Sequence, residues 1–466
     1  MAQKPAMGAH WAVIAGFILN SISPSAFPDS PGEERWSAQG QFTYIWHRKE
    51  AFGAAYANLN GSPNSLAQEK ERSFTATATA FLAARAWSGA EIHFAPELIS
   101  EIPLSNLHGL AGSIQNGELE KNGTVRPTLY RSRLFLRQTW GLGGQATSLE
   151  RGPLQMAGSA DSRRFVLTAG NLSIIDVFDR NAYASDVRQQ FVNMNFLTHA
   201  AYDFAADARG YSWGVAGEYY RDDWVFRLGR FIGPRHPNQL QLNYSIMRYY
   251  GDNLEIEHQH EFQERPGKVR LLLYRNVENM GRWDDAVNAF LADPAKNATT
   301  CQGFNYESAN SSAPDLCWAR KRNTKTGVGI SLEQSVTPDT GVFVRLMKAD
   351  GKSEVYAYTA TDSSLSSGVL ARGGRWGRPG DSAWIAYAQN RISAAHVKYL
   401  SLGGIDGFIG DGRISYRPEQ TFETYYNFGV SRSLWVTFDY QHIANPAYNA
   451  DRGPVNLYGI RLHAEF

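Results

Sequence analysis

The last ten residues of the chain, 457–466, alternate strictly between two kinds of side chain. The even positions from 458 to 466 hold aromatic or aliphatic residues, whereas the odd positions from 459 to 465 hold glycine, arginine, histidine and glutamate. Successive side chains of a strand point to opposite faces, so this stretch predicts a strand with one oily and one wet face. A final strand that ends on an aromatic residue is typical of outer-membrane barrels, in which it closes against the first strand. The alternative is an edge strand of a soluble sheet.

The same alternation recurs along the chain. Gaps between the alternating segments are mostly short, but 98–127, 172–209, 277–324 and 349–381 are long, and 282–291 has helical spacing of apolar residues. Segments of about ten residues, short turns on one side and long loops on the other are the pattern of a membrane barrel. We therefore predict an all-β fold, a transmembrane antiparallel β-barrel of about 16 strands. The predicted strands are 36–46, 73–82, 90–97, 129–140, 164–171, 211–219, 223–232, 240–250, 253–263, 268–276, 325–333, 341–348, 382–390, 420–430, 433–442 and 456–466.

Composition agrees with this class. The chain has 46 Lys and Arg against 45 Asp and Glu, which gives no electrostatic indication of a nucleic-acid partner. A mean hydropathy of −0.39 is too polar for a helical membrane protein, and 13% aromatic residues suits a barrel whose strands meet lipid on one face. Beyond the amino end, no run of 18 apolar residues exists that could form a spanning helix.

The amino end has the pattern of an export signal. Lys4 and His10 precede an apolar run over 11–19, and small residues follow up to Ala26. We expect a signal peptide over 1–26 and a single barrel domain over 27–466. A short buried helix is the alternative for the apolar run.

Two cysteines, Cys301 and Cys317, lie in one polar stretch. In an oxidising compartment such a pair is expected to form a disulfide, in preference to two free thiols. With no histidine at ligand spacing, the case for zinc is weak, and we expect no metal and no cofactor.

The segment 130–140 carries the most informative charges. Arg131, Arg133 and Arg137 share one face with Phe135, opposite leucines and aromatic residues. A charged side chain at mid-depth in lipid costs about 2–4 kcal/mol, so the alternation predicts that the three arginines form a ladder inside the barrel.

An acidic series lies further along the chain. Glu255, Glu257 and Glu261 share a face, and we expect them to line the lumen opposite the arginines. A pore with both columns offers donors and acceptors to a neutral polyhydroxylated solute and little to ions of either sign. Phe135 and Trp435 are candidates for stacking on sugar rings, although packing or the interfacial girdle is the commoner role for a tryptophan.

Motifs for catalysis are weak. The chain has no Gly-x-Ser-x-Gly elbow, no His-Glu-x-x-His pair and no phosphate loop. Asp176 and Asp179 could imitate the carboxylate pair of a glycosidase, but their separation cannot be read from the sequence. We therefore expect a protein that is not an enzyme.

Several blocks in order resemble the OprB-type carbohydrate-selective porins of bacterial outer membranes. The resemblance implies a barrel of sixteen strands, passive uptake of mono- and oligosaccharides, and an inward loop that narrows the pore. The stretch 172–209, with Asp176 and Asp179 among its polar residues, would suit that loop. The blocks are 129–140, 168–181, 202–214, 403–412 and 440–448 with the tail to Phe466.

We thus expect an outer-membrane porin through which neutral sugars diffuse down their gradient. Expected partners are the outer-membrane lipid, the barrel-assembly machinery through Phe466, and two further copies in a homotrimer, with no nucleic acid. The alternatives are an exporter of a secreted polysaccharide, a barrel enzyme, and a soluble secreted sugar-binding sandwich.

Overall fold

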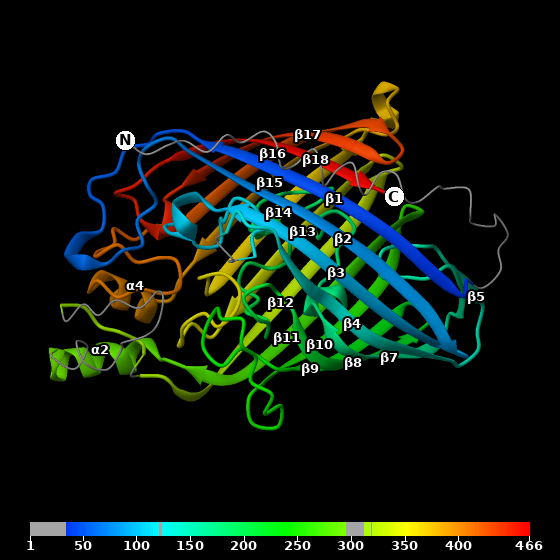
Figure 1. The fold of residues 1–466 in the computed structure, drawn as a ribbon, viewed down its shortest axis with the longest axis horizontal. Helices are drawn as coiled ribbons and strands as arrows, with labels where there is room; N and C mark the ends of the chain where they lie inside the picture. Colours follow the sequence, from blue (N-terminus) through cyan, green and yellow to red (C-terminus); the bar gives the residue numbers. More distant parts are fainter. Residues whose placement is uncertain (1–33, 121–123, 295–311, 318) are drawn as a thin grey trace.

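Sixteen strands close into one antiparallel barrel in a computed structural model that describes residues 34–120, 124–294, 312–317 and 319–466 (Figure 1). The fold class predicted from the alternation is confirmed. The barrel strands are β1 (Trp36–Lys49), β2 (Glu71–Trp87), β3 (Ala90–Ile102), β4 (Thr128–Gly141), β7 (Arg164–Leu172), β8 (Ser212–Arg221), β9 (Trp224–Phe231), β10 (Tyr250–Phe262), β11 (Arg265–Met280), β12 (Lys321–Thr337), β13 (Thr340–Ala349), β14 (Ser363–Arg372), β15 (Ser382–Arg391), β16 (Glu419–Ser431), β17 (Leu434–Ala444) and β18 (Val455–Glu465).

The two ends of the chain close the barrel. β18 pairs antiparallel with β1 from Gln41 opposite Glu465 to Lys49 opposite Leu457, and the backbones of Gly40 and Phe466 exchange two further hydrogen bonds. On β18 the apolar residues at positions 458, 460 and 462 are exposed on the outer face. The glycine, arginine and histidine at positions 459, 461 and 463 are buried inside the barrel. The predicted closing strand, oily outside and polar inside, is therefore correct.

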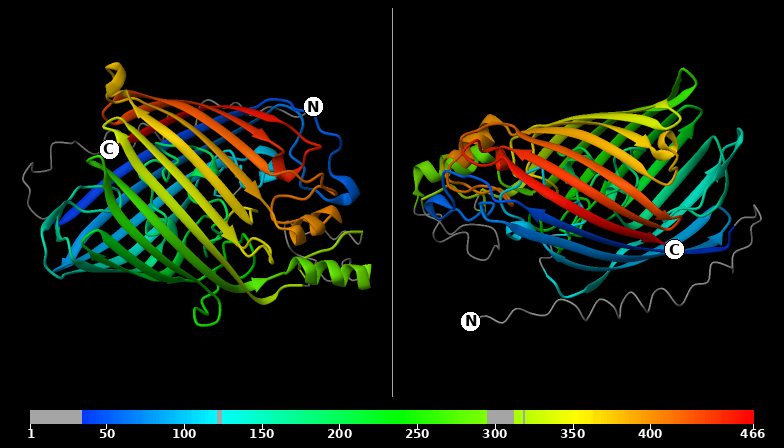
Figure 2. Two further views of the ribbon diagram at one scale, coloured as in Figure 1. Left: turned by 180° about the vertical axis from the view of Figure 1, so that it is seen from behind. Right: turned by 90° about the horizontal axis from the view of Figure 1, so that it is seen from above.

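The connections differ between the two ends of the barrel (Figure 2). At the turn end most connections are short, except residues 142–163, which carry the small hairpin β5 (Ala146–Leu149) and β6 (Gly158–Asp161). At the loop end the connections are long and carry α2 (Trp283–Ala292) and α4 (Ala394–Ser401). In membrane barrels short turns face the periplasm and long loops the exterior. Among the described residues, no helix has both the length and the apolar character needed to cross a membrane.

Helix α2 was expected over 282–291 and is confirmed. It begins after Arg282 with Asp284 and Asp285 in its first turn, where carboxylates interact favourably with the helix dipole. It buries Trp283 against α4, whose His396 ring stacks on the indole at 4.0 Å. The two helices form a cap at the loop end of the barrel.

Two strand assignments were wrong, although the total was right. The predicted strand 240–250 belongs almost wholly to the connection between β9 and β10, and β14 lies within a stretch that was predicted to be loop. β14 was missed because four of its first five residues are serines, so its outward face has little apolar contrast with its inward face. The false strand and the missed strand cancel in the count.

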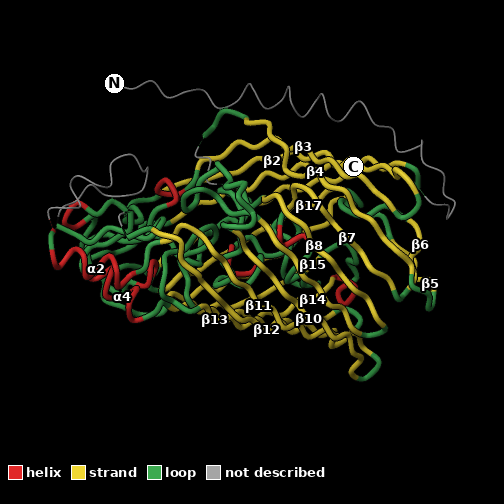
Figure 3. The backbone as a smooth tube through the Cα atoms, turned by 90° about the horizontal axis from the view of Figure 1, so that it is seen from below, coloured by secondary structure: helices red, strands yellow, loops and turns green. Residues whose placement is uncertain are grey.

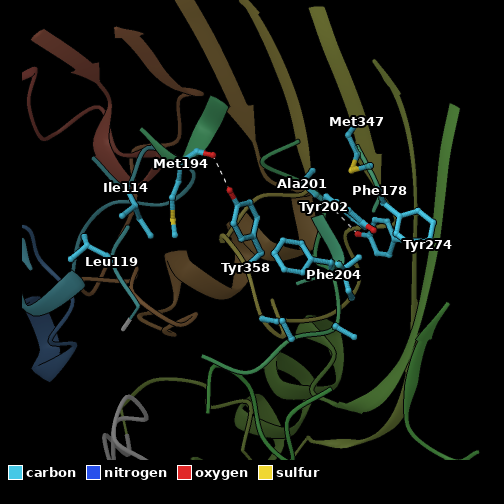
Figure 4. Packing of buried hydrophobic residues seen from close by; sticks show 14 of the residues in the cluster. Ile114, Leu119, Phe178, Met194, Ala201, Tyr202, Phe204, Tyr274, Met347 and Tyr358 are labelled. Atoms are coloured by element: carbon cyan, nitrogen blue, oxygen red, sulfur yellow. Dashed lines mark hydrogen bonds between the residues drawn. The ribbon is translucent and has the colours of Figure 1, made fainter. Parts of the chain in front are cut away.

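The interior is filled at the loop end by chain that folds back into the barrel (Figure 3). A hydrophobic cluster forms there between these inward segments and the wall (Figure 4). The Tyr358 hydroxyl donates to the Met194 carbonyl at 2.8 Å, and the Tyr274 hydroxyl donates to the Ala201 carbonyl at 3.1 Å. The core thus supports the loops that shape the lumen.

Candidate functional site

The segment 173–211, which we call the inward loop, connects β7 to β8 and lies inside the barrel. It contains the short 3-10 helices η4 (Ile174–Asp176) and η5 (Met194–Phe196). Unsatisfied backbone groups are costly when buried, so a chain that crosses the lumen needs partners from the wall. Those partners are inward-facing side chains of several strands.

Wall carboxylates accept hydrogen bonds from the backbone of the inward loop. Glu255 of β10 accepts from the Asp179 N–H at 2.6 Å, and Glu333 of β12 accepts from the Ala182 N–H at 2.8 Å. Glu423 of β16 accepts from the N–H groups of residues 192 and 193 at 2.7 and 3.0 Å. These bonds fix the loop at three points around the barrel.

Arginines hold the same loop through its carbonyls. The Arg345 guanidinium of β13 donates to the Phe196 carbonyl at 3.0 Å and forms an ion pair with Asp179 at 3.1 Å. Arg461 of β18 donates to the carbonyls of Val187 and Gln190, both at 2.7 Å. The wall therefore binds both the N–H groups and the carbonyl groups of the inward loop.

A second segment, residues 103–120 between β3 and β4, also folds inward. Glu419 of β16 accepts from the N–H groups of residues 111 and 113 at 3.1 and 2.8 Å. Arg188 of the inward loop joins this segment to the wall, because its guanidinium lies 2.9 Å from Glu118 and 2.8 Å from Glu97 of β3. Burial alone would lower the pKa of Arg188, but these two carboxylates hold it well above its ordinary value, so the side chain stays charged.

Between the two inward segments and the wall lies a cavity of about 860 Å³. It is the candidate solute path, because it occupies the space that the inward segments leave open. Its charged and aromatic lining comprises Glu118, Glu120, Arg133, Arg164, Asp176, Arg180, Asp186, Arg188, Phe204, Arg209, Tyr211, Tyr220, Arg227, Glu257, Lys268, Arg270, Glu333 and Tyr358.

Most of these charges are paired across neighbouring elements. Arg227 of β9 donates to Glu255 at 2.6 Å and to Glu257 at 3.0 Å, and Arg270 of β11 donates to Glu257 at 2.8 Å and to Glu333 at 3.1 Å. The result is a continuous band of alternating guanidinium and carboxylate groups over β9 to β12. Such a band presents donors and acceptors side by side with little net charge.

Further along the same wall, beyond β8, Arg133 of β4 makes a bidentate pair with Asp176 of the inward loop. The two nitrogen–oxygen distances are both 2.8 Å, and the guanidinium lies 5.2 Å from the ring centroid of Tyr211. Arg164 of β7 stacks on Tyr220 at 3.8 Å. Guanidinium groups stacked on aromatic rings are held in place while keeping N–H groups free for a solute.

The predicted arginine ladder is correct for Arg133 and Arg137 and wrong for Arg131. Arg133 and Arg137 face inward, but Arg131 lies on the outer face, with its guanidinium 5.0 Å from the ring of Trp213. The register shifts between β3 and β4, where Ala95 faces Arg133 and Pro96 faces Arg131. Ser132 is therefore the extra residue of a bulge, which reverses the alternation before it. Tyr130, expected on the lipid face, points inward and bonds Glu97 and Glu120.

The other predicted residues of β4 lie inside but away from the cavity. Phe135 is buried and stacks on His93 with centroids 4.7 Å apart. Arg137 donates to the Leu154 carbonyl of the turn-end hairpin at 2.7 Å. Trp435 of β17 faces inward near the turn end and stacks on His463 at 5.7 Å.

The predicted carboxylates separate into lining and supporting groups. Glu257 and Asp176 line the cavity, whereas Glu255 and Asp179 are buried beneath it as anchors of the inward loop. Glu261 is exposed near the turn end of β10 and does not line the cavity. The sequence predicted an open column of carboxylates that faces the arginines of β4 across the lumen. In the structure, arginines of adjacent strands neutralise these carboxylates instead.

Two arginines that complete the band, Arg227 and Arg270, were not among the residues predicted from the sequence. Arg227 and Arg270 alternate with outward apolar residues on β9 and β11, so the same periodicity argument finds their orientation. Arg188 was seen only as one polar residue of a long loop. Arg180, also on the inward loop, is exposed to the cavity and has no ion pair with any described residue.

The cysteine and metal expectations remain predictions. Cys317 is disulfide-bonded, whereas Cys301 lies outside the described residues, as does the expected signal peptide over 1–26. Among the residues the structure describes, no group of three or more His, Cys, Asp or Glu side chains is placed to hold a metal ion.

Comparison with known families decides the class. The model of the carbohydrate-selective porin family OprB matches residues 66–466, which is most of the chain. The chain belongs to the OprB family. It is an outer-membrane β-barrel porin for the uptake of carbohydrates.

One solved structure supports the fold of this OprB-family porin. The high-pH structure of Pseudomonas putida OprB has a TM-score of 0.66 at 15% identity, covering 92% of this chain and 94% of that chain. The Acinetobacter baumannii protein OccAB1 has a TM-score of 0.47 at 12% identity, covering 93% of this chain and 97% of that chain. No curated protein sequence matches the chain significantly.

Proposed function

We propose that neutral sugars cross this porin through the cavity between the inward loop and strands β4 and β7 to β12. The observation that carries the proposal is the pairing of the lining charges. Arg227, Arg270, Glu257 and Glu333 form one hydrogen-bonded band, and Arg188 joins the opposite wall to the inward loop. A paired band attracts free ions weakly, yet its edges exchange hydrogen bonds with hydroxyl groups.

The aromatic side chains of the cavity supply the second element of sugar recognition. Tyr211 and Tyr220 line the cavity, and each carries an arginine over its ring. A sugar has apolar C–H faces and polar edges, so it can lie against an aromatic face while its hydroxyls reach the neighbouring guanidinium. We infer that Arg133 with Tyr211 forms one such step, and Arg164 with Tyr220 another.

We infer further that passage needs no covalent chemistry, since the family is one of porins. Three predictions made from the sequence remain proposals. They are the homotrimer, the disulfide between Cys301 and Cys317, and recognition by the assembly machinery through Phe466. No observation in the fold favours export of a polysaccharide.

Sugar block of ion current tests the path. Reconstituted in planar bilayers, the porin should lose block by glucose when Arg133→Ala and Arg188→Ala are combined, with an apparent affinity about tenfold lower for the loss of charged hydrogen-bond donors. Arg131→Ala is the matched control, because it removes the same group from the outer face of the same strand. If the double variant is blocked as strongly as the unaltered porin, the path does not follow these residues.

Solute size gives the complementary test. In liposome swelling, monosaccharides should enter fastest and rates should fall with oligosaccharide length, because the inward segments leave open a cavity of only about 860 Å³. Equal rates for a monosaccharide and a charged amino acid of the same size would contradict selection of neutral polyols.

A further inference from the structure

A second hollow lies on the outer face of the barrel, away from the lumen. It covers strands β12 to β15 and has a volume of about 440 Å³. Its apolar floor is formed by Val328, Ile330, Leu346 and Leu365. We call this hollow the outer groove.

The groove exists because β14 presents small side chains between larger ones. On β14 the outward residue at the loop end of the hollow is Ser363, which lies between Lys348 on β13 and Arg391 on β15. The next outward residue, Leu365, lies between Leu346 and Gln389. Side chains of neighbouring strands stand beside one another on the sheet face, so small residues on the middle strand leave a furrow along it. The furrow runs along the strand, which crosses the membrane at a tilt of about 35–45°, so it leads from the membrane surface toward the apolar interior.

Two cations close the groove at the loop end. Lys348 and Arg391 both lie directly opposite Ser363 in the ladder, one on each side, and both are exposed on the outer face. With neighbouring strands 4.7–4.9 Å apart, their Cα atoms are separated by about 10 Å. Among the described residues neither Lys348 nor Arg391 forms an ion pair. With the Gln389 amide oriented so that its oxygen faces the guanidinium, that oxygen accepts from Arg391 Nη2 at 2.9 Å.

We propose that the outer groove binds a phosphorylated glycolipid of the outer leaflet. Unpaired cations at the membrane surface are attracted to anionic headgroups, and an apolar furrow below them accommodates an acyl chain. The glycolipid is favoured over a phospholipid because its two phosphates lie at opposite ends of a disaccharide. Two cations about 10 Å apart, one on each side of Ser363, match such a pair of charges. The loop end faces the exterior, which places the site in the outer leaflet.

Binding of purified lipid A to the detergent-solubilised porin tests the proposal, with native mass spectrometry as the readout. We expect one retained lipid A for each chain. In the variant Lys348→Gln with Arg391→Gln the affinity should be lower by a factor of about ten or more, because two charge-assisted contacts are lost. The control variant, Arg375→Gln with Arg432→Gln, removes two exposed cations at the turn end and should bind like the unaltered chain. Ser363→Phe, which places a bulky side chain in the groove and keeps both cations, should also weaken binding.

Three outcomes would overturn the site. They are unchanged binding in the Lys348 and Arg391 variant, an equal loss in the turn-end control, and equally tight binding of dephosphorylated lipid A or of phosphatidylglycerol. Retained heat-modifiable mobility on gels shows that each variant has folded. The solute path is untouched by these substitutions, so glucose block should be the same in all of them.

Discussion

Arg345 offers a direct test of how the inward loop is held. Its buried guanidinium donates to the Phe196 carbonyl, to the Asp179 carbonyl at 3.1 Å and to the Ser185 hydroxyl at 3.0 Å, and it pairs with the Asp179 carboxylate. Arg345→Met keeps an apolar stem of similar length and removes every one of these donors. The perturbation is therefore confined to the contact between β13 and the inward loop.

The size of the effect follows from what is left behind. Removing one partner of a buried ion pair costs about 3–5 kcal/mol, because the other charge stays buried without compensation. Asp179 keeps the Thr198 hydroxyl at 2.7 Å and the His199 N–H at 3.2 Å, so the lower end of that range applies. About 3 kcal/mol is roughly two orders of magnitude in the equilibrium between the held and released loop.

Release should stay local, since other anchors remain. Glu255 and Glu333 still accept from the N–H groups of residues 179 and 182, and Glu423 still accepts from those of residues 192 and 193. Single-channel recordings of Arg345→Met should thus show larger and noisier conductance, with weaker block by glucose, while the barrel stays folded. The same substitution at Arg131 on the outer face is the control. A quiet channel of unaltered conductance would refute the view that Arg345 holds the constriction.

Three further results are expected. Arg180 is exposed to the lumen and forms no ion pair among the described residues. Arg180→Glu should raise the ratio of cation to anion permeability several-fold, measured from the reversal potential in a KCl gradient. An unchanged reversal potential would place Arg180 off the ion path. Burial raises the pKa of Asp406 to about 7, although His396 lies at 3.3 Å. The contribution of Asp406 to the stability of the loop-end cap is therefore fully present below pH 3.8 and falls, by up to about 4 kcal/mol, as the pH rises to 7. Hydrogen exchange in α4 should respond to that range of pH more strongly in the parent than in Asp406→Asn. Deleting residues 146–161 should raise conductance, because Leu154 of that hairpin lines the cavity. The deletion leaves ends that are already close, since the Ser162 N–H donates to the Gln145 carbonyl at 2.8 Å. Unchanged conductance would place the hairpin outside the path.

The barrel could be predicted from the sequence because it depends on one local rule. Wherever large apolar side chains alternate with polar ones, as on β18, periodicity gives both the strand and its two faces. The rule failed where that contrast was absent or misleading. β14 carries serines on both faces, and residues 240–250 contain apolar side chains such as Met247 that are exposed on a loop.

The error at Arg131 has a different origin, because it lies in the pairing between strands. Pro96 on β3 has no N–H to donate to the ladder, and proline within a sheet is confined to edges and bulges. The signal for a bulge was therefore present, but on the neighbouring strand. Its position on β4 depends on the register, which the alternation of one strand does not determine.

The use of the inner-face charges could not be predicted for a related reason. Alternation places Glu255, Glu419 and Glu423 inside the barrel, but it does not say what they meet there. A loop that crosses the lumen brings many backbone N–H groups into a water-poor space, and carboxylates are strong acceptors for them. Much of the acidic inner face is consequently occupied by the protein itself, and adjacent arginines neutralise what remains. The lumen offered to a solute is thus far less charged than its wall, as passage of neutral sugars requires.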